Sequence, residues 1–230
     1  WQKATPVVDF IQKEPVEGVA PTDRMEVRFI YDDTALYVGA RMFASGPIQS
    51  MLSRRDDGAQ VESIEIELDT FLDRRTAYSF GVTAAGVRLD HFHPTDTETN
   101  EDTEYDPVWQ ARTEFTVEGW TAELWLPFSQ LRFNARDEHV WGLNIKRDVP
   151  SLDEENYWAL IRRTETGWAS RFGELHGLQG VTSGRRLEVV PYVAGSSSVN
   201  ADRDLANPFD DGKNLSGRSG ADLKFGLGSN

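Results

Sequence analysis

The side chains best suited to binding an ion are concentrated in one segment, LDHFHPTDTETNEDTEYDPVWQART, which runs from Leu89 to Thr113. Between Asp90 and Asp106 the segment contains seven carboxylates and two histidines but no basic residue. Hard cations such as calcium prefer clustered carboxylate and carbonyl oxygens. The segment therefore has three interpretations: a metal-binding loop, the rim of a ligand cleft, or a hydrated connection without a ligand.

A calcium site in this segment would use Asp96, Asp102 and Asp106. The stretch DTETNEDTEYDP begins like an EF-hand loop, but its sixth residue is Glu101, where an EF-hand requires glycine. Its twelfth residue is Pro107 instead of glutamate, so an EF-hand is excluded. Two interpretations stay open: a calcium site of another type, and a hydrated flap without an ion, which repulsion among the carboxylates favours.

Two further groups of polar side chains could bind a ligand. His91 and His93 alternate along an expected strand and therefore point to the same side, a geometry that suits a transition metal. The alternative is a pair of half-exposed strand histidines. Arg75, in the stretch DRRTAY, has a guanidinium that can bind a carboxylate or sugar hydroxyls, or can form ion pairs between neighbouring loops.

Aromatic side chains provide another kind of candidate site. Sugar recognition requires flat aromatic faces and planar polar groups, and the sequence has seven tryptophans. Trp158 and Trp168 flank the turn RRTETG, where they could form an aromatic clamp; the alternative places both in the core. Trp120 and Trp125 are five residues apart in one expected strand, so they face opposite sides and one of them belongs to the core.

Alternation with period two dominates the elements that must position these groups. RMEVRFIYDD and TALYVGARMF predict one hairpin, TAYSFGVT and VRLDHF a second, and ARTEFTV and WTAELWLPF a third. In VESIEIELD, Ile64, Ile66 and Leu68 share one face, and we expect the opposite face to be wet. Helical periodicity is limited to a short turn at FSQLRF. At least eight expected strands predict an all-β, antiparallel two-sheet β-sandwich over residues 1–184.

Residues 185–230 differ from the preceding residues in composition and pattern. RRLEVVPYVAGSSS and SGADLKFGLGSN predict two strands, separated by a polar stretch from Ser196 to Gly220. Apolar residues in the second strand alternate with polar or small ones, which is typical of a transmembrane β-strand. We interpret the segment as the first hairpin of an outer-membrane β-barrel, with an ordinary surface hairpin as the alternative.

Charge and composition restrict the function classes. The 24 basic and 38 acidic residues give a net charge of −14, which argues against nucleic acid as a partner, because phosphates demand a basic surface. The absence of cysteine excludes disulfides and thiolate zinc sites, and it fits an exported bacterial protein. There is no run of about 18 apolar residues, and the start at Trp1 without an apolar leader leads us to expect N-terminal processing.

Several phrases occur together in order: EVRFIYDDTALYVGARMF, DRRTAYSFGVTAAGVRLD, YDPVWQARTEFTVEGWTAELWLPFSQLRF, WGLNIKRDV and GRRLEVVPY. They resemble the N-terminal domain of a family of bacterial outer-membrane proteins of unassigned function. In that family, a DOMON-like domain similar to family 9 carbohydrate-binding modules precedes a C-terminal β-barrel. The resemblance runs from about Phe10 to the C-terminus.

The resemblance implies a two-sheet sandwich, export, and a bacterial outer-membrane location with the domain in the periplasm or at the cell surface. It also implies a chain that is cut soon after its barrel begins. Family 9 modules sandwich the sugar between two tryptophans and carry structural calcium, so a sugar clamp and calcium are implied as well.

No G-x-S-x-G, H-E-x-x-H or phosphate-binding motif is present, so we expect no enzyme. The leading hypothesis is a non-catalytic module that binds a glycan or small polar ligand and is attached to its own outer-membrane barrel. Three alternatives stay open: a domain that gates the barrel without binding sugar, an enzyme that cleaves polysaccharide with paired carboxylates, and a redox module. The last would hold haem non-covalently through Met25, Met42 or Met51.

Overall fold

The structure is a computed structural model that describes residues 1–57, 60–102, 104–183, 187–199 and 212–225. The chain divides into two units, residues 1–184 and 185–229, and each is described by itself. Within the described ranges, no helix is long and apolar enough to cross a membrane.

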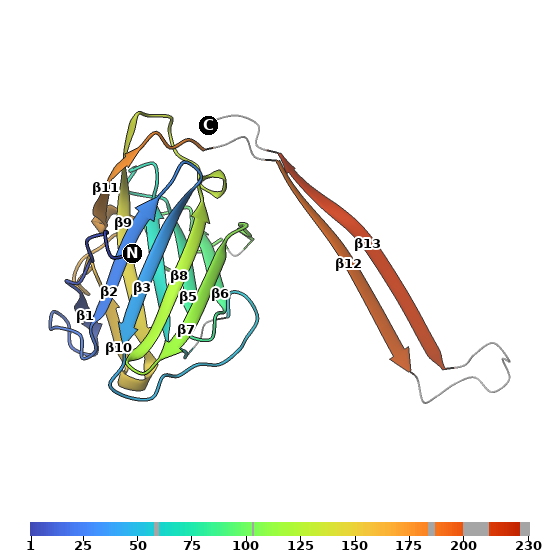
Figure 1. The fold of residues 1–230 in the computed structure, drawn as a ribbon, viewed down its shortest axis with the longest axis horizontal. Coiled ribbons are helices and arrows are strands. Elements are labelled where there is room, and N and C mark those ends of the chain that lie inside the picture. Colours follow the sequence, from blue (N-terminus) through green and yellow to red (C-terminus); the bar gives the residue numbers. More distant parts are fainter. Residues whose placement is uncertain (58–59, 103, 184–186, 200–211, 226–230) are drawn as a thin grey trace. The chain divides into compact units, whose positions relative to one another are not determined.

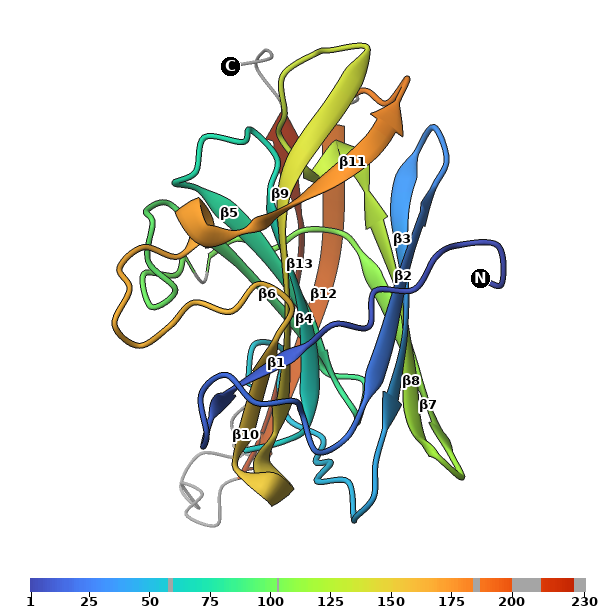
Figure 2. The same cartoon turned by 90° about the vertical axis from the view of Figure 1, so that its left-hand side faces the viewer.

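Two antiparallel sheets face each other in the first unit (Figures 1 and 2). The four-stranded sheet has the order β2 (Met25–Tyr31), β3 (Ala35–Phe43), β8 (Gly119–Pro127) and β7 (Gln110–Thr116). The seven-stranded sheet has the order β1 (Ile11–Glu14), β10 (Glu154–Tyr157), β9 (Glu138–Val149), β4 (Ser63–Asp69), β5 (Ala77–Thr83) and β6 (Arg88–His93), and β11 (Gly173–Gln179) also pairs with β9. Short 3₁₀ turns occur at η1 (Phe128–Gln130), η2 (Pro150–Leu152) and η3 (Ala169–Arg171). The prediction of all-β, antiparallel sheets is confirmed.

The core lies between the two sheets and is filled by the inward-facing residues of each strand. In β4, Ile64, Ile66 and Leu68 are completely buried, as the alternation predicts. Full burial of each such side chain contributes about 1.5–3 kcal/mol, so this layer holds the sheets together. The largest buried side chains include three tryptophans, Trp109, Trp120 and Trp141.

An ion pair is buried at one place within this interior. The side chains of Arg147 and Glu62 are 0% and 1% exposed, and Nη2 of Arg147 lies 2.5 Å from Oε1 of Glu62. The same guanidinium nitrogen donates to the Phe43 carbonyl, and the Trp120 indole donates to Glu62 over 2.7 Å. The Glu62 carboxylate is therefore compensated by hydrogen bonds as well as by charge, which burial of a charge requires.

The local turns follow the predicted hairpins. β2 pairs with β3, β5 with β6, and β7 with β8. Asp32 closes the first turn by accepting hydrogen bonds from the backbone of Thr34 and Ala35. Gly86 in the second turn has φ +84, a conformation that costs glycine little because it has no Cβ. The helical turn expected at FSQLRF is η1.

The sequence predicts a solvent-exposed outer face for β4, and this prediction is wrong. Ser63 and Glu67 are only 2% and 1% exposed, although both point away from the core between the sheets. Glu67 is close enough to Glu98 for that charge to raise its pKa, and Glu98 also reaches Lys146 on the neighbouring strand β9. Ser63 instead donates a hydrogen bond to Asp148 of β9. Alternation with period two predicts which side chains point away from the core, but it does not predict whether other groups cover them.

The second unit is a two-stranded antiparallel ribbon of β12 (Leu187–Val199) and β13 (Lys213–Phe225). The register runs without interruption from Leu187 opposite Phe225 to Val199 opposite Lys213. β12 ends at Val199, one residue beyond the predicted strand RRLEVVPYVAGSSS, whereas β13 begins at Lys213, well inside the stretch from Ser196 to Gly220 that the sequence predicted to be a polar loop. That boundary was wrong, because Ser, Gly and Asn residues can continue a strand when the partner strand supplies the ladder; residues 200–211 lie outside the described residues.

Candidate functional site

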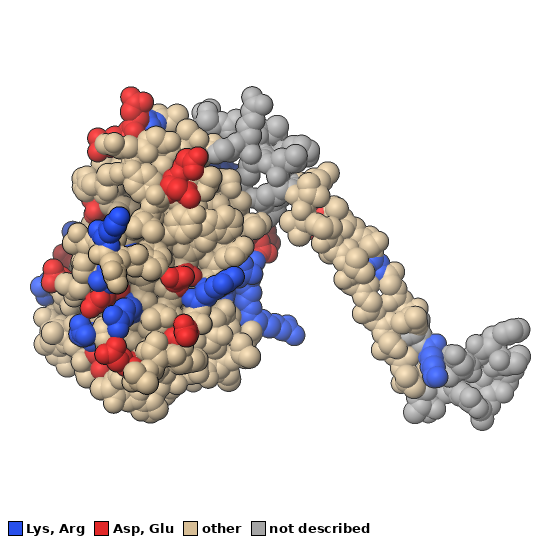
Figure 3. Space-filling view, in the orientation of Figure 1, with Lys and Arg blue, Asp and Glu red and all other residues tan. Residues whose placement is uncertain are grey.

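The outer face of the four-stranded sheet presents side chains in rows that the strand register defines. One row crosses β2, β3, β8 and β7 as Arg28, Gly39, Glu123 and Arg112. Figure 3 shows this face of the first unit, with basic and acidic groups interspersed among uncharged surface. The residues between these positions along each strand point into the core, so the row belongs entirely to the outer surface.

A groove of about 550 Å³ follows this row. Its floor includes Gly39, and because this residue has no side chain, the Trp1 indole approaches the backbone closely there. Its lining includes one aromatic side chain, three basic groups, two acidic groups and a hydroxyl: Trp1, Arg28, Arg41, Arg112, Glu114, Glu123 and Thr121.

The Trp1 indole forms one wall of the groove. Its ring lies directly against Gly39, because a Cβ added there would be only 2.7 Å from a ring carbon. The indole N–H donates to Oε1 of Glu123 over 2.6 Å, and 41% of the residue is exposed. An aromatic face is thus fixed beside a carboxylate at the point where the sheet surface is lowest.

A row of aromatic residues lies next to the groove. Tyr37 on β3 is directly opposite Trp125 on β8, and both are half-buried on the outer face. The Tyr37 hydroxyl donates to Oδ2 of Asp32 over 2.9 Å. That bond is the main reason why the pKa of Tyr37 is raised, and hydrogen bonds from Thr34 and Tyr37 lower the pKa of Asp32 to about 2. The row is therefore rigid at its Tyr37 end.

Ion pairs fix two of the groove arginines at the groove margins. Arg28 lies 3.0 Å from Glu26, and Arg41 lies 2.8 Å from Glu118. The pair of Arg41 is exposed and contributes only about 0–1 kcal/mol to stability, whereas the pair of Arg28 is half-buried. Both pairs orient a guanidinium group. The remaining groove arginine, Arg112, is exposed and faces Glu123 across the strand pair.

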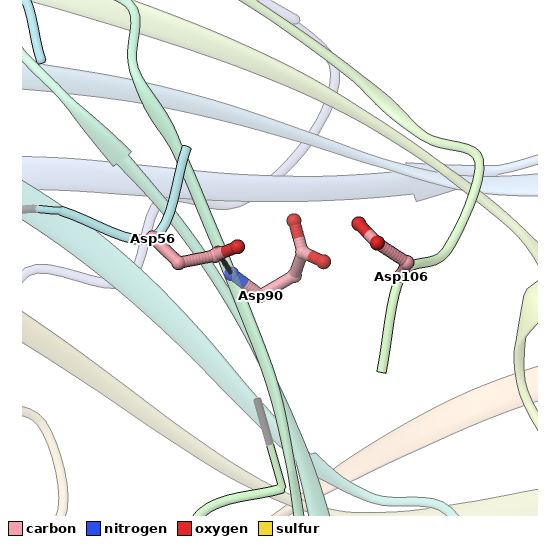
Figure 4. A group of neighbouring side chains, drawn as sticks. All are labelled: Asp56, Asp90 and Asp106. Atoms are coloured by element: carbon pink, nitrogen blue, oxygen red, sulfur yellow. Dashed lines mark hydrogen bonds between the residues drawn. The ribbon is translucent and has the colours of Figure 1, made fainter. Parts of the chain in front are cut away.

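A second candidate site is a cluster of three aspartates. The carboxylates of Asp56, Asp90 and Asp106 offer oxygens that lie within 4.8 Å of one another, close enough to hold a metal ion (Figure 4). Asp90 comes from β6, while Asp56 and Asp106 come from the connections before β4 and after β6. Oδ1 of Asp56 accepts the Asp90 backbone N–H over 2.9 Å, and the Trp109 indole donates to Asp90.

Arg55 already supplies positive charge to this cluster. Its Nε and Nη2 donate to the two oxygens of Asp90 over 2.9 and 2.7 Å, and its Nη1 lies 2.9 Å from Asp106. Nη2 also donates to the Pro107 carbonyl. A calcium ion bound to the same oxygens would have to displace this two-pronged contact, so the donor set fits a guanidinium better than it fits calcium.

The acidic segment covers part of the outer face of the seven-stranded sheet. Glu98 is the central contact: it lies 3.4 Å from Lys146 Nζ and 3.9 Å from Lys13 Nζ, and it accepts the Tyr157 hydroxyl proton over 3.2 Å. Further along, Asp102 pairs with Phe92 through the backbone. The segment is neither a free flap nor a loop whose carboxylates gather at one point.

Carboxyl groups beneath this segment have raised pKa values. Burial is the main cause for Glu65, whose pKa rises to about 7, and the charges of Asp148, Glu98 and Glu101 raise it further while Lys146 opposes the rise. The pKa of Glu67 is also raised, again mainly by burial. Burial has the opposite effect on the nearby base His93, whose pKa falls to about 4.

The predicted tryptophan clamp is not an open clamp in the structure. Trp168 is only 3% exposed and packs on His93, with 4.1 Å between ring centroids, and on Phe172. Trp158 is half-buried and lies against Gly173, where a Cβ would approach its ring within 2.5 Å. Burial leaves Trp168 no face for a ligand, because its surroundings already fill both sides.

The three predicted calcium ligands have separate roles. Asp96 accepts the backbone N–H groups of Trp168 and Ser170 over 2.7 and 2.9 Å and the Ser170 hydroxyl over 2.6 Å. These bonds lower its pKa although burial opposes them. Asp102 accepts the Glu104 backbone N–H. Of these three aspartates, only Asp106 belongs to a cluster of carboxylates, found among the described residues, that is compact enough for a metal.

The structure also shows where the other predicted site residues lie, namely Arg75, His91 and His93. The Arg75 backbone N–H donates to Asp73 within a tight turn, and its side chain is exposed. His93 shares a 2.9 Å hydrogen bond with Ser79, and His91 lies 3.8 Å from Glu101.

The three methionines considered for haem are not gathered at one site. Met25 and Met42 face each other across β2 and β3 in the core, whereas Met51 is 61% exposed.

Sequence reasoning missed the groove residues Trp1, Gly39, Glu123 and Arg112. One signal was present: Trp120 and Trp125 had to face opposite sides, and Trp120 is indeed in the core at 1% exposure. Trp125 therefore marks the outward face of β8, and the register then places Gly39 and Arg112 in the row beside it. The contribution of Trp1 has no local signal, because it depends on a long-range contact.

Comparisons with solved structures identify the fold. The chain is similar to a family 9 carbohydrate-binding module from Caldicellulosiruptor kristjanssonii in complex with cellotriose, with a TM-score of 0.53 and 16% identity over 76% of this chain and 83% of that chain. For the module in complex with glucose, the TM-score is 0.56 at 16% identity, over 80% of this chain and 87% of that chain. A candidate carbohydrate-binding protein from Bacteroides uniformis gives a TM-score of 0.56 at 12% identity, over 74% of this chain and 86% of that chain.

No family model and no curated protein matches the chain. At identities of 12–16% the structural likeness shows the fold alone. The antiparallel sheets therefore resemble the family 9 sandwich, and function has to be argued from the groove.

Proposed function

We propose that the first unit is a non-catalytic carbohydrate-binding module whose ligand lies in the groove on the outer face of the four-stranded sheet. The observation that carries the proposal is the combination, in one groove, of an exposed indole and planar charged groups. The fold likeness to modules solved with glucose and cellotriose supports it.

Each part of the groove matches a part of a pyranose ring. The indole of Trp1 offers an apolar face on which the C–H surface of a sugar can stack. The carboxylate of Glu123 can accept hydrogen bonds from hydroxyls, and the guanidinium of Arg112 can donate to ring or hydroxyl oxygens. Because the indole itself lies on Gly39, the sugar would stack on the exposed outer side of Trp1.

The test is binding to soluble glucose and to oligosaccharides of glucose, xylose and mannose, measured by titration calorimetry. We expect Trp1→Ala and Glu123→Gln to weaken binding by about tenfold each, the effect of losing about 1.4 kcal/mol. Trp158→Ala, which alters the half-buried tryptophan of the predicted clamp, is the control and should bind normally. Binding lost with Trp158→Ala but kept with Trp1→Ala would move the site to the original clamp.

We also propose that the second unit is the beginning of an outer-membrane barrel, which makes the first unit a binding module attached at that membrane. The support is the alternation of the ribbon. Val189 and Val193 share one face with Leu223, and these residues are 55%, 87% and 58% exposed. A two-stranded ribbon with an exposed apolar face is marginal alone and needs further strands or lipid.

Association with lipid vesicles tests this second proposal. Val193→Lys places a charge on the apolar face and should abolish association, because a lysine in a lipid-facing position costs about 2–4 kcal/mol at the bilayer centre. Ser198→Lys adds the same charge on the opposite face of the ribbon and should have a much smaller effect. Equal behaviour of both variants would mean that the apolar face does not contact lipid.

A further inference from the structure

Strand β7 is the outermost strand of the four-stranded sheet (Figure 1), and its outer edge has no strand partner among the described residues. Thr116 and Gly119 close a two-residue turn, so they exchange backbone hydrogen bonds across the β7–β8 pair. Because the direction of the backbone groups alternates along a strand, those of Ala111, Thr113 and Phe115 point to the free edge. These N–H and C=O groups are a template for another strand.

The features that commonly protect the edge strands of monomeric proteins are missing from β7. Native edges often carry lysine, proline or a bulge that discourages pairing. β7 has the sequence QARTEFT, without lysine or proline, and its register with β8 contains no bulge. Two apolar side chains at this edge are open to solvent: Phe115 is 53% exposed, and Val117, in the turn after the strand, is fully exposed. The edge is therefore regular, partly apolar and free to pair.

The charges of β7 are complementary to those of a second copy of the same strand. Arg112 and Glu114 are both exposed on the outer face, and neither has an ion-pair partner among the described residues. An antiparallel pairing of two β7 strands centred on Thr113 places Arg112 of each copy opposite Glu114 of the other. The same register places Ala111 opposite Phe115, so the apolar side chain at the edge gains cover. Opposite charges that face each other across strands stabilise the pairing.

The direction of the backbone groups agrees with this register. The groups of Thr113 point to the free edge, so the two Thr113 residues would form a hydrogen-bonded pair at the centre. Arg112 and Glu114 then occupy the non-hydrogen-bonded pairs, in which opposite side chains are closest to each other. A shift of the centre by one residue would turn the required backbone groups away from the partner strand.

We propose that two copies of this chain associate edge to edge through β7, with a two-fold axis at Thr113. The interface is isologous, because each copy gives Arg112 to the Glu114 of the other. The two four-stranded sheets join into one continuous sheet, and the grooves of both copies open on the same face of it. The inference goes beyond the proposed function and does not depend on sugar binding.

A charge exchange tests the register. Sedimentation velocity of the whole chain should show a monomer–dimer equilibrium that depends on concentration. Glu114→Arg brings two arginines together on each side of the axis, and it should raise the dimer dissociation constant about tenfold or more. Adding Arg112→Glu to that variant exchanges the two charges and should restore the wild-type dissociation constant. Dimerisation through the β12–β13 ribbon or any other surface would not produce this rescue.

A disulfide locates the axis independently, because the chain has no cysteine of its own. Thr113→Cys places a thiol opposite its own copy, with about 5.5 Å between Cα atoms, which suits a disulfide. Mild oxidation should cross-link this variant into dimers on a non-reducing gel. Thr116→Cys is the matched control on the same strand. It lies about 20 Å from its own copy in the proposed register, so it should stay monomeric on the gel.

Each outcome decides for or against the β7 interface. A protein that stays monomeric at every concentration overturns the proposal. A dimer with the same dissociation constant in wild type and Glu114→Arg also overturns it, as does equal cross-linking of Thr113→Cys and Thr116→Cys. The charge exchange and the cross-link use different positions, so if one variant does not fold, the other still decides.

Discussion

Glu65→Gln is expected to change how the stability of the protein depends on pH. Glu65 lies on the face of β4 that Glu98 and its neighbours cover, and its pKa is raised from 4.5 to about 7. The substitution keeps the size of the side chain and its ability to hydrogen-bond but removes its titration. The difference between wild type and variant therefore isolates one group from all the others.

The sign and size follow from linkage between protonation and folding. Because the folded state holds the proton on Glu65 more tightly than the unfolded state does, protonation stabilises the fold. This contribution is fully present below pH 4.5 and is lost as the pH rises through about 7. At about 1.4 kcal/mol per pKa unit, the loss amounts to roughly 3 kcal/mol.

His93 opposes this trend in the same pH window. Its pKa falls from 6.5 to about 4, mainly through burial, so the folded state disfavours its protonated form. The contribution is present above pH 6.5 and is lost as the pH falls through about 4, again by roughly 3 kcal/mol. The two groups therefore have opposite effects on the unfolding free energy between pH 4.5 and 6.5. When one group is substituted, the pH dependence caused by the other group becomes visible.

Urea denaturation followed by circular dichroism at pH values from 4 to 8 measures both effects. The unfolding free energy of Glu65→Gln minus that of wild type should increase by about 3 kcal/mol as the pH rises from 4.5 to 7.5. The same difference for His93→Asn should increase by about the same amount as the pH falls from 7 to 4. Glu138→Gln, at an exposed position of β9, is the control and should follow the wild-type curve. A Glu65→Gln curve parallel to wild type would refute the burial of that carboxyl group.

Three further predictions concern the interior and the aspartate cluster. Glu62→Gln leaves Arg147 buried without its counter-charge and should lower the unfolding free energy in urea by about 3–5 kcal/mol; a loss below about 1 kcal/mol would contradict a dry ion pair. EDTA should leave the melting temperature unchanged, because Arg55 neutralises the aspartate cluster; a fall that added calcium restores would reveal a bound ion. Gly167→Ala should cost about 1–3 kcal/mol in thermal unfolding, since its φ is +91 and a Cβ would lie 2.8 Å from Asp96; an unchanged melting temperature would show that the turn adapts.

The hairpins could be predicted because their information is local. The alternation in β2 and β3 and the Asp32 turn lie within about twenty residues, and the same holds for the hairpin at Gly86. Local alternation also assigned Ile64, Ile66 and Leu68 to the core. Each of these predictions needs only the sequence of the element itself and of its turn.

The covered face of the seven-stranded sheet could not be predicted in the same way. Glu67 looks solvent-facing in β4 because its neighbours alternate, yet it is 1% exposed and the charge of the distant Glu98 acts on it. Asp96 and Trp168 are 72 residues apart in sequence, yet one hydrogen bond joins them. Trp168 is buried against His93, and nothing near it in the sequence indicates which segment will pack on it.

The outer faces of the two sheets differ in how many of their side chains are already engaged by other residues, and this difference decides where a ligand can bind. One sheet has buried acids and bases on its outer face, and groups such as Lys146 are already engaged there by Glu98 and Asp148. A ligand at that face would have to break several of these contacts before it gained any of its own. The other sheet has Arg112, Glu123 and Trp125 on its outer face, with a groove between the rows. Fewer contacts have to be broken there, so we expect the proposed ligand on the four-stranded sheet.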